Sequence, residues 1–305
     1  MTKLALIAAV AIARGRAGAT NKLLRLNVGV LLSAAFLGAL ALSAIFAPWV
    51  APYDPTMSDI LSNLLPPLSE GQPGAPMYVF GTDVVGRDVF SGVIYGGRIS
   101  LTVAVAAFIG AGILGTVLGL AAGYVRGMFD EVVMRLVDIQ LAFPFIVLAI
   151  MVMYVMGPGL WDIVLALVIA QWPIYARVAR AEALSLSASD FVMAARSMGA
   201  GHLRIMFRHI LPNAFSPLAV IAAFAVPQMI ILEAALSFLG LGVPPETVSW
   251  GSMLAAGRVT LEQAWWIATF PGLAIMAAVL SINILVDALR LKLGALPVDR
   301  GRNAY

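Results

Sequence analysis

The sequence contains no cysteine and very little charge: only 11% of its 305 residues are Asp, Glu, Lys or Arg. The absence of cysteine excludes disulfide bonds and thiolate chemistry. Soluble domains contain about 25% charged residues, whereas 61% of this chain is hydrophobic. This balance indicates a protein that crosses a membrane several times. The formal net charge of +3 is too small to suggest nucleic acid as a partner.

Residues that perform catalysis are also scarce. The two histidines, His202 and His209, belong to no His-Glu-x-x-His pattern, and the chain has no Gly-x-Ser-x-Gly elbow. Each of the three lysines is followed by leucine, so there is no Walker A loop for a nucleotide. We therefore predict no catalytic residue, no metal site and no cofactor bound by this chain. Any ATP-driven work requires a partner.

Long uncharged stretches predict an all-α membrane protein, because about 20 apolar residues suffice to cross a bilayer. Six spans are expected, at residues 26–53, 99–125, 139–161, 163–176, 210–241 and 263–286. The fourth is short and contains Pro173. We expect it to continue past Arg177, with that side chain reaching towards the interface.

The lysines and arginines are distributed unevenly between the connecting segments. All but three of the nineteen lie in segments on the same side as the N-terminus, and the exceptions are Arg87, Arg98 and Arg258. The positive-inside rule therefore predicts that both termini are cytoplasmic. The expected organisation is an N-terminal arm (1–26), a membrane domain (27–290) and a C-terminal tail (291–305). Its main loops are two outer loops (51–98 and 242–262) and one cytoplasmic loop (182–211).

The first outer loop contains six prolines and a cluster of glycine and acidic residues. The cluster reads Phe80-Gly81-Thr82-Asp83 and continues with Gly86-Arg87-Asp88. Thr82 or Asp83 can cap a helix, and valines at 85, 89 and 93 recur on one helical face. This pattern predicts an amphipathic helix lying on the outer surface before the second span. In the other outer loop, Trp250 belongs either to a structured cap over the pathway or to a simple loop.

Three glycines in the second predicted span, Gly115, Gly119 and Gly123, recur every four residues on one helical face. Such spacing favours close packing between membrane helices, with pathway lining as the alternative. Gly110, Gly112 and Gly115 also match a dinucleotide-binding fingerprint. That fingerprint requires a preceding strand, which an uncharged membrane span cannot supply, so we do not interpret it as a cofactor site.

Glu233 is an acidic residue deep inside the fifth predicted span. Placing a carboxylate in hydrocarbon costs at least about 2.5 kcal/mol, so this side chain should face protein or water and be paired or protonated. Two interpretations remain open. Glu233 either contacts the translocation route or makes a structural hydrogen bond.

The cytoplasmic loop contains a polar stretch that predicts a short helix. The residues able to cap its start are Ser187, Ser189 and Asp190. The helix would begin near Phe191 and end at Gly199 or Gly201. About nine residues at about 1.5 Å each give a rod roughly 14 Å long.

The composition of this helix suits docking. Ala194 and Ala195 leave part of one side flat, while Phe191 and Met198 project from it. Small residues allow close approach, and an aromatic side chain can fill a pocket on another protein. Pro212 then marks re-entry into the membrane. The alternative is a surface helix that rests on the chain's own loops.

The same segment resembles the EAA loop of ATP-binding-cassette importer permeases. That motif places Glu-Ala-Ala before a glycine and a later Leu-Pro; here Met193-Ala194-Ala195, Gly199 and Leu211-Pro212 occupy those positions. Two positions depart from the motif. Met193 replaces the glutamate, which removes one charged contact, and His209 occupies the isoleucine position.

Further stretches are similar to the "C" subunits of the dipeptide/oligopeptide permease family. They are Phe80–Asp83 with Gly86–Asp88, Gly97–Leu101, Leu236–Gly242 with Pro244-Pro245, Ser249–Gly251, and Pro271 with Asn283 and Asp287. The resemblance runs from about residue 28 to 290, and the tail departs from the family pattern.

This resemblance implies the six-helix fold of a type I importer permease in the bacterial inner membrane. It also implies several partners: a homologous permease, two ATPase subunits that bind ATP and Mg, an extracytoplasmic binding protein and the lipid bilayer. The helix at 190–200 would then sit in an ATPase cleft. The competing hypothesis is a self-contained secondary transporter or channel, for which only Glu233 is a clear candidate coupling group. Neither hypothesis identifies the transported solute.

Overall fold

The computed structural model describes residues 28–71, 76–244 and 246–294. The predicted arm 1–26 and residues 295–305 of the predicted tail lie outside the described residues. Within the described ranges the chain is helical, with two isolated β-bridges and no strand. Five helices are long and apolar enough to cross a membrane, and a sixth span results if one bent pair of helices is counted. The predicted fold class, an all-α membrane protein, is confirmed.

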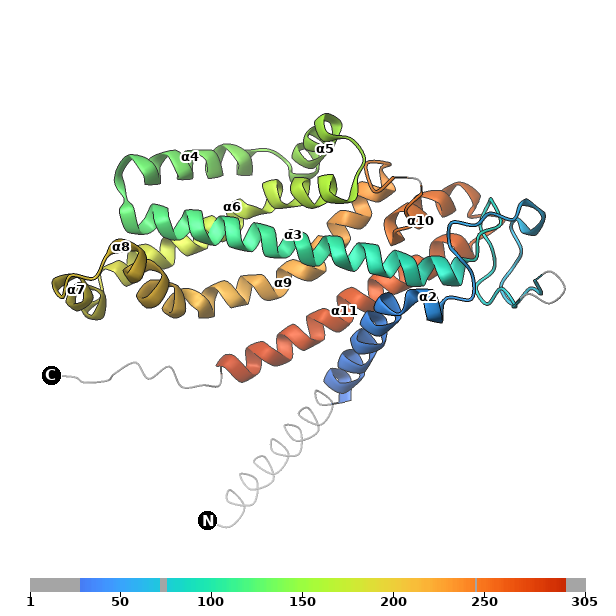
Figure 1. Cartoon of the computed structure of the whole chain (residues 1–305), viewed down its shortest axis with the longest axis horizontal. Coiled ribbons are helices and arrows are strands. Elements are labelled where there is room, and N and C mark those ends of the chain that lie inside the picture. The colour runs from blue at the N-terminus through green and yellow to red at the C-terminus, as the bar shows by residue number, and fades with distance from the viewer. Residues whose placement is uncertain (1–27, 72–75, 245, 295–305) are drawn as a thin grey trace, which may run out of the picture.

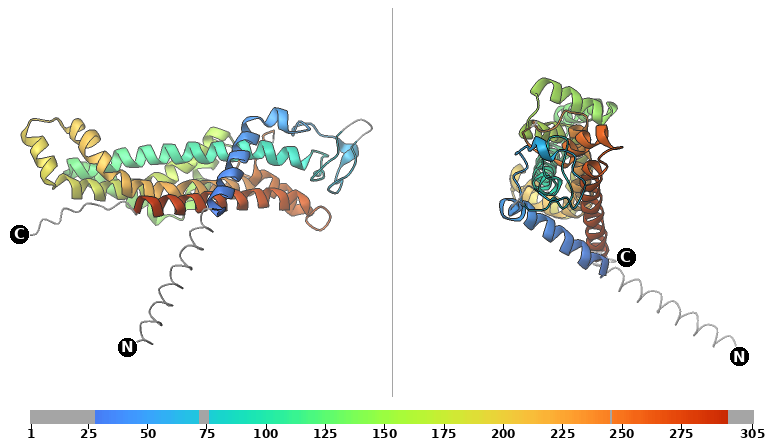
Figure 2. Two further views of the ribbon diagram at one scale, coloured as in Figure 1. Left: turned by 90° about the horizontal axis from the view of Figure 1, so that it is seen from below. Right: turned by 90° about the vertical axis from the view of Figure 1, so that its right-hand side faces the viewer.

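Five long helices form the body of the molecule. They are the first helix (Val28–Ile45), α3 (Val89–Val125), α6 (Leu160–Ser187), α9 (Leu211–Phe238) and α11 (Trp266–Gly294). Helices α3, α6 and α9 run along the long axis of the molecule, and α11 continues beside them (Figure 1). The first helix leaves this body at an angle, which the views in Figure 2 show clearly.

Shorter helices lie between and beyond the long ones. They are α2 (Ala47–Val50), η1 (Ile60–Ser62), α4 (Gly127–Ala142), α5 (Phe145–Met156), α7 (Asp190–Ser197), α8 (His202–Arg204), the π-helix η2 (Ile205–Ile210), α10 (Trp250–Gly257) and η3 (Arg258–Thr260). Helices α7 and α8 lie at one end of the long axis, and α10 with the 51–88 segment lies at the other (Figure 1). We call these the α7 end and the α10 end.

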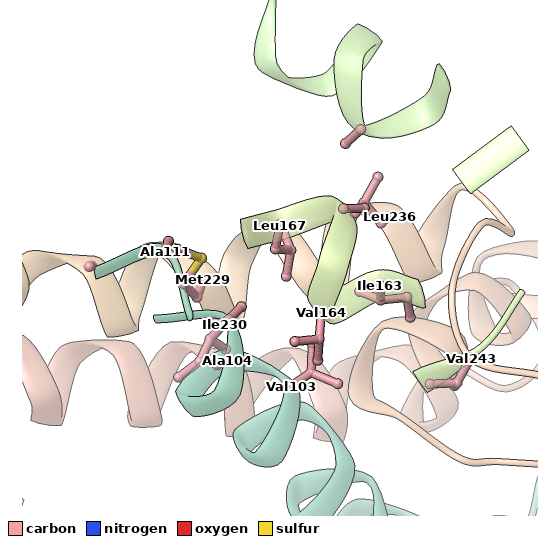
Figure 3. Packing of buried hydrophobic residues seen from close by; sticks show 14 of the residues in the cluster. Val103, Ala104, Ala111, Ile163, Val164, Leu167, Met229, Ile230, Leu236 and Val243 are labelled. Carbon is pink, nitrogen blue, oxygen red and sulfur yellow. The ribbon is translucent and has the colours of Figure 1, made fainter. Parts of the chain in front are cut away.

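The core lies where α3, α6 and α9 meet. Its buried side chains include Val103 and Ala104 from α3, Leu167 from α6 and Ile230 from α9, all fully buried (Figure 3). Small residues on α3 let the neighbouring helices approach closely, as packing between membrane helices requires.

The predicted surface helix before the second span is wrong. Asp88, not Thr82 or Asp83, is the N-cap, and α3 runs without a break from Val89 through all 37 residues to Val125. Val85 precedes the helix and is exposed. Residues 89–99 contain no proline and a single charged residue, Arg98, so nothing breaks the helix there and these turns extend the span. At about 1.5 Å per residue α3 is about 56 Å long, more than a hydrocarbon core of about 30 Å needs.

The prediction of one straight third span at 139–161 is also wrong. Two helices replace it, α4 and α5, which meet at an angle of 100°. Pro144 caps α5, and the preceding Phe143 is extended (ψ 140°). A residue before proline disfavours the helical region, which explains the break. Helix α4 is held against α6 by a bidentate ion pair between Arg180 and Asp130, at 2.5 and 2.7 Å.

The fourth span extends past Arg177 as predicted, because α6 continues through Pro173 to Ser187. The Arg177 guanidinium pairs with Asp138 of α4 at 2.8 Å, and both side chains are more than half exposed. An ion pair this exposed contributes little to stability.

Candidate functional site

Helix α7 has well-defined ends. Ser189 is its N-cap residue, although no side-chain hydrogen bond caps the helix. At the other end Gly199 adopts a left-handed conformation (φ +78°). The Gly199 N–H donates to the Arg196 carbonyl at 3.0 Å, and the Ala200 N–H donates to the Ala195 carbonyl at 3.1 Å. This pair of bonds is a Schellman motif, which favours glycine at this position.

The two sides of α7 face different surroundings. Phe191, Met193 and Met198 are exposed, with Met198 the most so at 82%, and Ala194 is exposed with them. Ala195 faces the opposite way and is only 3% exposed. The predicted flat side is therefore divided, since Ala194 lies on the outward surface while Ala195 contacts the chain's own residues.

Tyr124, near the end of α3, anchors the α7 segment. Its hydroxyl lies 3.1 Å from Nδ1 of His202, and the Arg196 guanidinium stacks over its ring at 5.4 Å. Tyr124 also belongs to a buried cluster that contains Val192 of α7, Ile205 of η2 and other residues of α3, α6 and α9. Tyr124 has no distinguishing feature in the sequence, because a single tyrosine near a helix end matches no motif.

Leu211 and Pro212 mark the start of α9, where η2 leads into it. Leu211 is partly buried against the same cluster, and Pro212 is exposed in the first turn of α9. The helical path is continuous from His202 to Phe238, but its backbone is π-helical over Ile205–Ile210. A π-helical stretch often marks a functional site or a hinge within a helix.

The glycine stripe of α3 faces α6. A Cβ added at Gly119 would overlap the Ala176 carbonyl oxygen, and one at Gly123 would lie 2.5 Å from the Arg180 carbonyl oxygen. At Gly115 an added Cβ would overlap the Trp172 carbonyl oxygen. All three positions thus allow a backbone-to-backbone approach that no larger residue permits.

Trp250 is fully buried at the α10 end, at the first residue of α10. Its indole N–H donates to the Val93 carbonyl at 2.8 Å. Gly96 and Gly97 of α3 lie against the ring, where added Cβ atoms would come within 3.1 and 2.9 Å of it. Trp250 is therefore part of a structured cap that binds α10 to α3, and not of a simple loop.

Glu233 is completely buried beneath this cap. Its Oε1 accepts a hydrogen bond from the Ser237 hydroxyl at 2.8 Å, whereas its Oε2 has no partner at hydrogen-bond distance among the described residues. The hydroxyls of Ser100 and Ser249 are close neighbours of the carboxyl. This surrounding favours the structural interpretation of Glu233, since the side chain does not reach the surface of the chain.

The glycine and acidic cluster forms the turn that starts α3. Gly81 and Gly86 have positive φ values of 76° and 78°, and a Cβ at Gly86 would overlap the Asp59 backbone. Asp83 Oδ1 accepts hydrogen bonds from the backbone N–H groups of Val85 and Arg87 at 2.9 and 2.8 Å.

Asp88 accepts the Ser91 N–H at 2.8 Å through its Oδ2. Burial raises the pKa of the carboxyls of Asp83 and Asp88 above the usual range, and their hydrogen bonds oppose that rise. Both residues, with Arg87, line a cavity of about 230 Å³ between the two loops at the α10 end.

Two family models match the chain. Residues 115–294 match the binding-protein-dependent transport system inner membrane component, and residues 22–67 match the N-terminal TM domain of oligopeptide transport permease C. Together they cover the first span and most of the helical body, including α7.

Three curated relatives extend the likeness over most of the chain. The di/tripeptide transport system permease protein DppC of Pseudomonas aeruginosa is 42% identical over 87% of both chains. The dipeptide transport system permease protein DppC of Haemophilus influenzae is 40% identical over 87% of this chain and 89% of its own. The probable D,D-dipeptide transport system permease protein DdpC of Escherichia coli is 36% identical over 85% and 84%.

A solved structure shares the fold. The chain resembles a chain of the MetNI methionine ABC transporter in an inward-facing conformation, with a TM-score of 0.53 and 17% identity. The match covers 66% of this chain and 95% of that one.

Proposed function

Since the chain belongs to the family of binding-protein-dependent transport system inner membrane components, we propose that it forms half of a translocation pathway for peptides in an ATP-binding-cassette importer. The observation that carries this proposal is the extent of the likeness. At 42% identity it covers 87% of the chain and of a di/tripeptide transport permease.

Helix α7 is the proposed contact with the ATPase subunits. Phe191 and Met198 project from its exposed side and can enter a cleft on a partner, while Val192 fixes its other side to the body. A displacement of α7 is transmitted to α3 through Tyr124 and to α9 through η2. Coupling requires two arrangements of the helices that the ATPase pair binds with different affinity.

The chain itself has no catalytic role in this proposal, and ATP and Mg bind to the partner ATPase subunits. The membrane is the bacterial inner membrane, with α7 and both termini in the cytoplasm. The distribution of arginine and lysine supports this orientation, because all but three of the nineteen lie in segments of the cytoplasmic side.

Two further partners complete the proposed importer. A homologous permease subunit supplies the other half of the pathway. An extracytoplasmic binding protein delivers the solute to the α10 end, where the segment before α3 and the segment between α9 and α11 lie.

The alternative, a self-contained secondary transporter or channel, is weaker. Such a transporter needs an ionisable group in the membrane that solvent or solute can reach. Glu233 was the candidate, and its side chain is fully buried and bonded to Ser237. Uptake by this chain alone in liposomes, without any ATPase, would favour the alternative.

Substitutions on the outward side of α7 test the coupling role. Met198→Arg places a charge where the proposed contact is apolar, so binding-protein-stimulated ATPase activity and co-purification of the ATPase should fall at least tenfold. Met128→Arg is the matched control, because Met128 is similarly exposed (81%) but lies on α4. If Met198→Arg retained ATPase binding and peptide uptake at normal protein levels, the α7 contact would be refuted. Ala195→Arg is a poorer test, since Ala195 faces inward.

A further inference from the structure

A groove between α6 and α9 contains three polar side chains, Gln171 and Tyr175 of α6 and Gln228 of α9. Its volume is about 190 Å³. Gln171 is 11 residues from the start of α6, and Gln228 is 10 residues from the end of α9. At about 1.5 Å per residue both lie about 15–17 Å from the α10 end of their helices. This is half of a hydrocarbon core of about 30 Å whose outer boundary lies at those helix ends.

The polar groups of this groove lack partners within the described chain. The Tyr175 side chain is only 4% exposed, and its hydroxyl has no hydrogen-bond partner. Gln171 as a residue is 5% exposed, and its side-chain amide forms no hydrogen bond with a described residue. Gln228 is exposed on the surface of α9.

Gln140 of α4 shows how a glutamine at membrane depth is normally satisfied. Its Oε1 accepts the Trp172 indole N–H at 3.0 Å, and its amide nitrogen donates to the Ile169 carbonyl. Gln171 and Gln228 have no such partners among the described residues, and an unpaired amide in hydrocarbon is costly. In a bilayer those two side chains must therefore face water, a polar solute or polar groups of a partner chain.

We propose that this groove is a subsite for the backbone amide of a peptide in transit, an inference that rests on the proposed transport function. A glutamine amide carries both donors and an acceptor, so two of them can pair with the N–H and C=O of a peptide bond. The Tyr175 hydroxyl adds a third group of either kind.

The rest of the groove fits solutes with varied side chains. Its other lining residues include Ile174, Ile221 and Phe224, which offer apolar contact without directional bonds, and none of the lining residues is charged. The nearby Arg290 is not among the lining residues, and its guanidinium lies over the Phe224 ring, 4.9 Å from the ring centre. The groove therefore recognises the peptide bond, which all peptides share, and not their charged ends.

Accessibility to water gives the first test, and the absence of native cysteine makes it simple. In the assembled importer in nanodiscs, Gln228→Cys should react with a charged methanethiosulfonate reagent. Ile169→Cys is the matched control at a similar depth, on the surface of α6 about 200° away from Gln171. Ile169→Cys should react at least tenfold more slowly. Equal rates, or no reaction at Gln228→Cys, would overturn the proposal.

Transport gives the second test, with alanyl-alanine as the probe in the complete importer reconstituted into liposomes. Combining Gln171→Leu with Gln228→Leu should reduce the peptide moved per ATP at least fivefold, while the binding protein still stimulates the ATPase. Gln140→Leu should lower thermal stability without changing this ratio. A peptide-to-ATP ratio unchanged by the double substitution would refute the subsite. Loss of the assembled complex would also refute it, because the groove would then be a contact with the partner permease.

An analogue with an N-methylated peptide bond, supplied at a concentration that saturates the binding protein, tests what is recognised. The double substitution should reduce transport of this analogue by a smaller factor than it reduces transport of alanyl-alanine. The methylated peptide bond has no N–H, so the hydrogen bond that it would donate to the groove is already absent. An equal difference for both solutes would refute recognition of the amide. If the wild-type importer moved neither peptide with ATP, the proposed function itself would fail, which is a separate result.

Discussion

The Gly119→Ala substitution offers the sharpest test of how the helices are held together. The added Cβ would overlap the Ala176 carbonyl oxygen and lie 2.8 Å from the carbonyl carbon. Non-bonded carbon atoms are optimally separated by about 3.5–4.0 Å, so α3 and α6 must move apart by about 1 Å. The obstacle is backbone, so no change of rotamer can relieve the overlap.

The expected magnitude follows from two opposing effects. Overpacking typically costs about 1–3 kcal/mol, and the backbone contact places this case near 3 kcal/mol. The better helix propensity of alanine offsets about 1 kcal/mol of that cost. A separation of about 1 Å also weakens the dispersion contacts along the rest of the stripe. We therefore expect the free energy of unfolding to fall by about 2 kcal/mol.

Gly112→Ala is the matched control on the same helix. There the nearest atom to an added Cβ is Cε1 of Tyr175, at 3.8 Å, which is an ordinary contact. This variant should be unchanged or more stable by up to about 1 kcal/mol. Reversible unfolding of both variants in mixed micelles, with SDS as the denaturant, measures the difference. If Gly119→Ala proved as stable as Gly112→Ala, close packing of α3 on α6 would not hold this fold together.

Substitutions at three further positions test the ends of the helices. Tyr124→Phe removes the hydrogen bond to His202, so we expect trypsin to cleave the α7 segment about fivefold faster, equivalent to about 1 kcal/mol; an unchanged rate would contradict the anchoring role. Gly199→Ala should destabilise α7 by about 1–2 kcal/mol through the positive φ alone, since open space surrounds the Cβ position. Gly199→Asn should destabilise it by less, because asparagine tolerates the left-handed conformation better. Hydrogen exchange of the α7 amides measures both variants, and equal exchange rates in the two would contradict this reasoning. Asp88→Ala should cost about 1 kcal/mol in thermal unfolding by removing the N-cap of α3, whereas Asp88→Asn preserves it. Because burial raises the pKa of Asp88, its ionisation lowers stability as pH rises through and above the ordinary range of aspartate, and Asp88→Asn should abolish that component of the pH dependence.

The spans were predicted correctly where a few neighbouring residues determine the structure, and wrongly where packing between distant residues determines it. A run of uncharged residues identifies a span regardless of its neighbours. The extension of α6 past Arg177 was expected because the uncharged run 163–176 is too short to cross a bilayer, and α6 does continue to Ser187. The 100° bend at Pro144 was missed because the whole stretch is apolar enough for one span. The proline was visible in the sequence, but whether it kinks, caps or is absorbed depends on packing: α6 continues through Pro173 without a comparable break.

In the α7 segment, too, some features follow from the local sequence and others depend on tertiary packing. Its helix and its terminal glycine follow from local capping chemistry. Which side faces outward does not, and Ala194 and Ala195, adjacent in sequence, lie on opposite sides. The role of Tyr124 depends on His202, 78 positions further along the chain.

From the sequence alone came the membrane class, the approximate spans, the short α7 helix and the glycine stripe, because hydrophobicity, charge and capping act over a few neighbouring residues. Only the tertiary structure decided which polar groups inside the membrane are satisfied. Glu233 is enclosed by the α10 cap, Gln140 is paired with Trp172, and Gln171 and Gln228 are left open to a groove. A hydrogen bond within a bundle requires a partner from another helix, and the distance to that partner is set by how the helices pack.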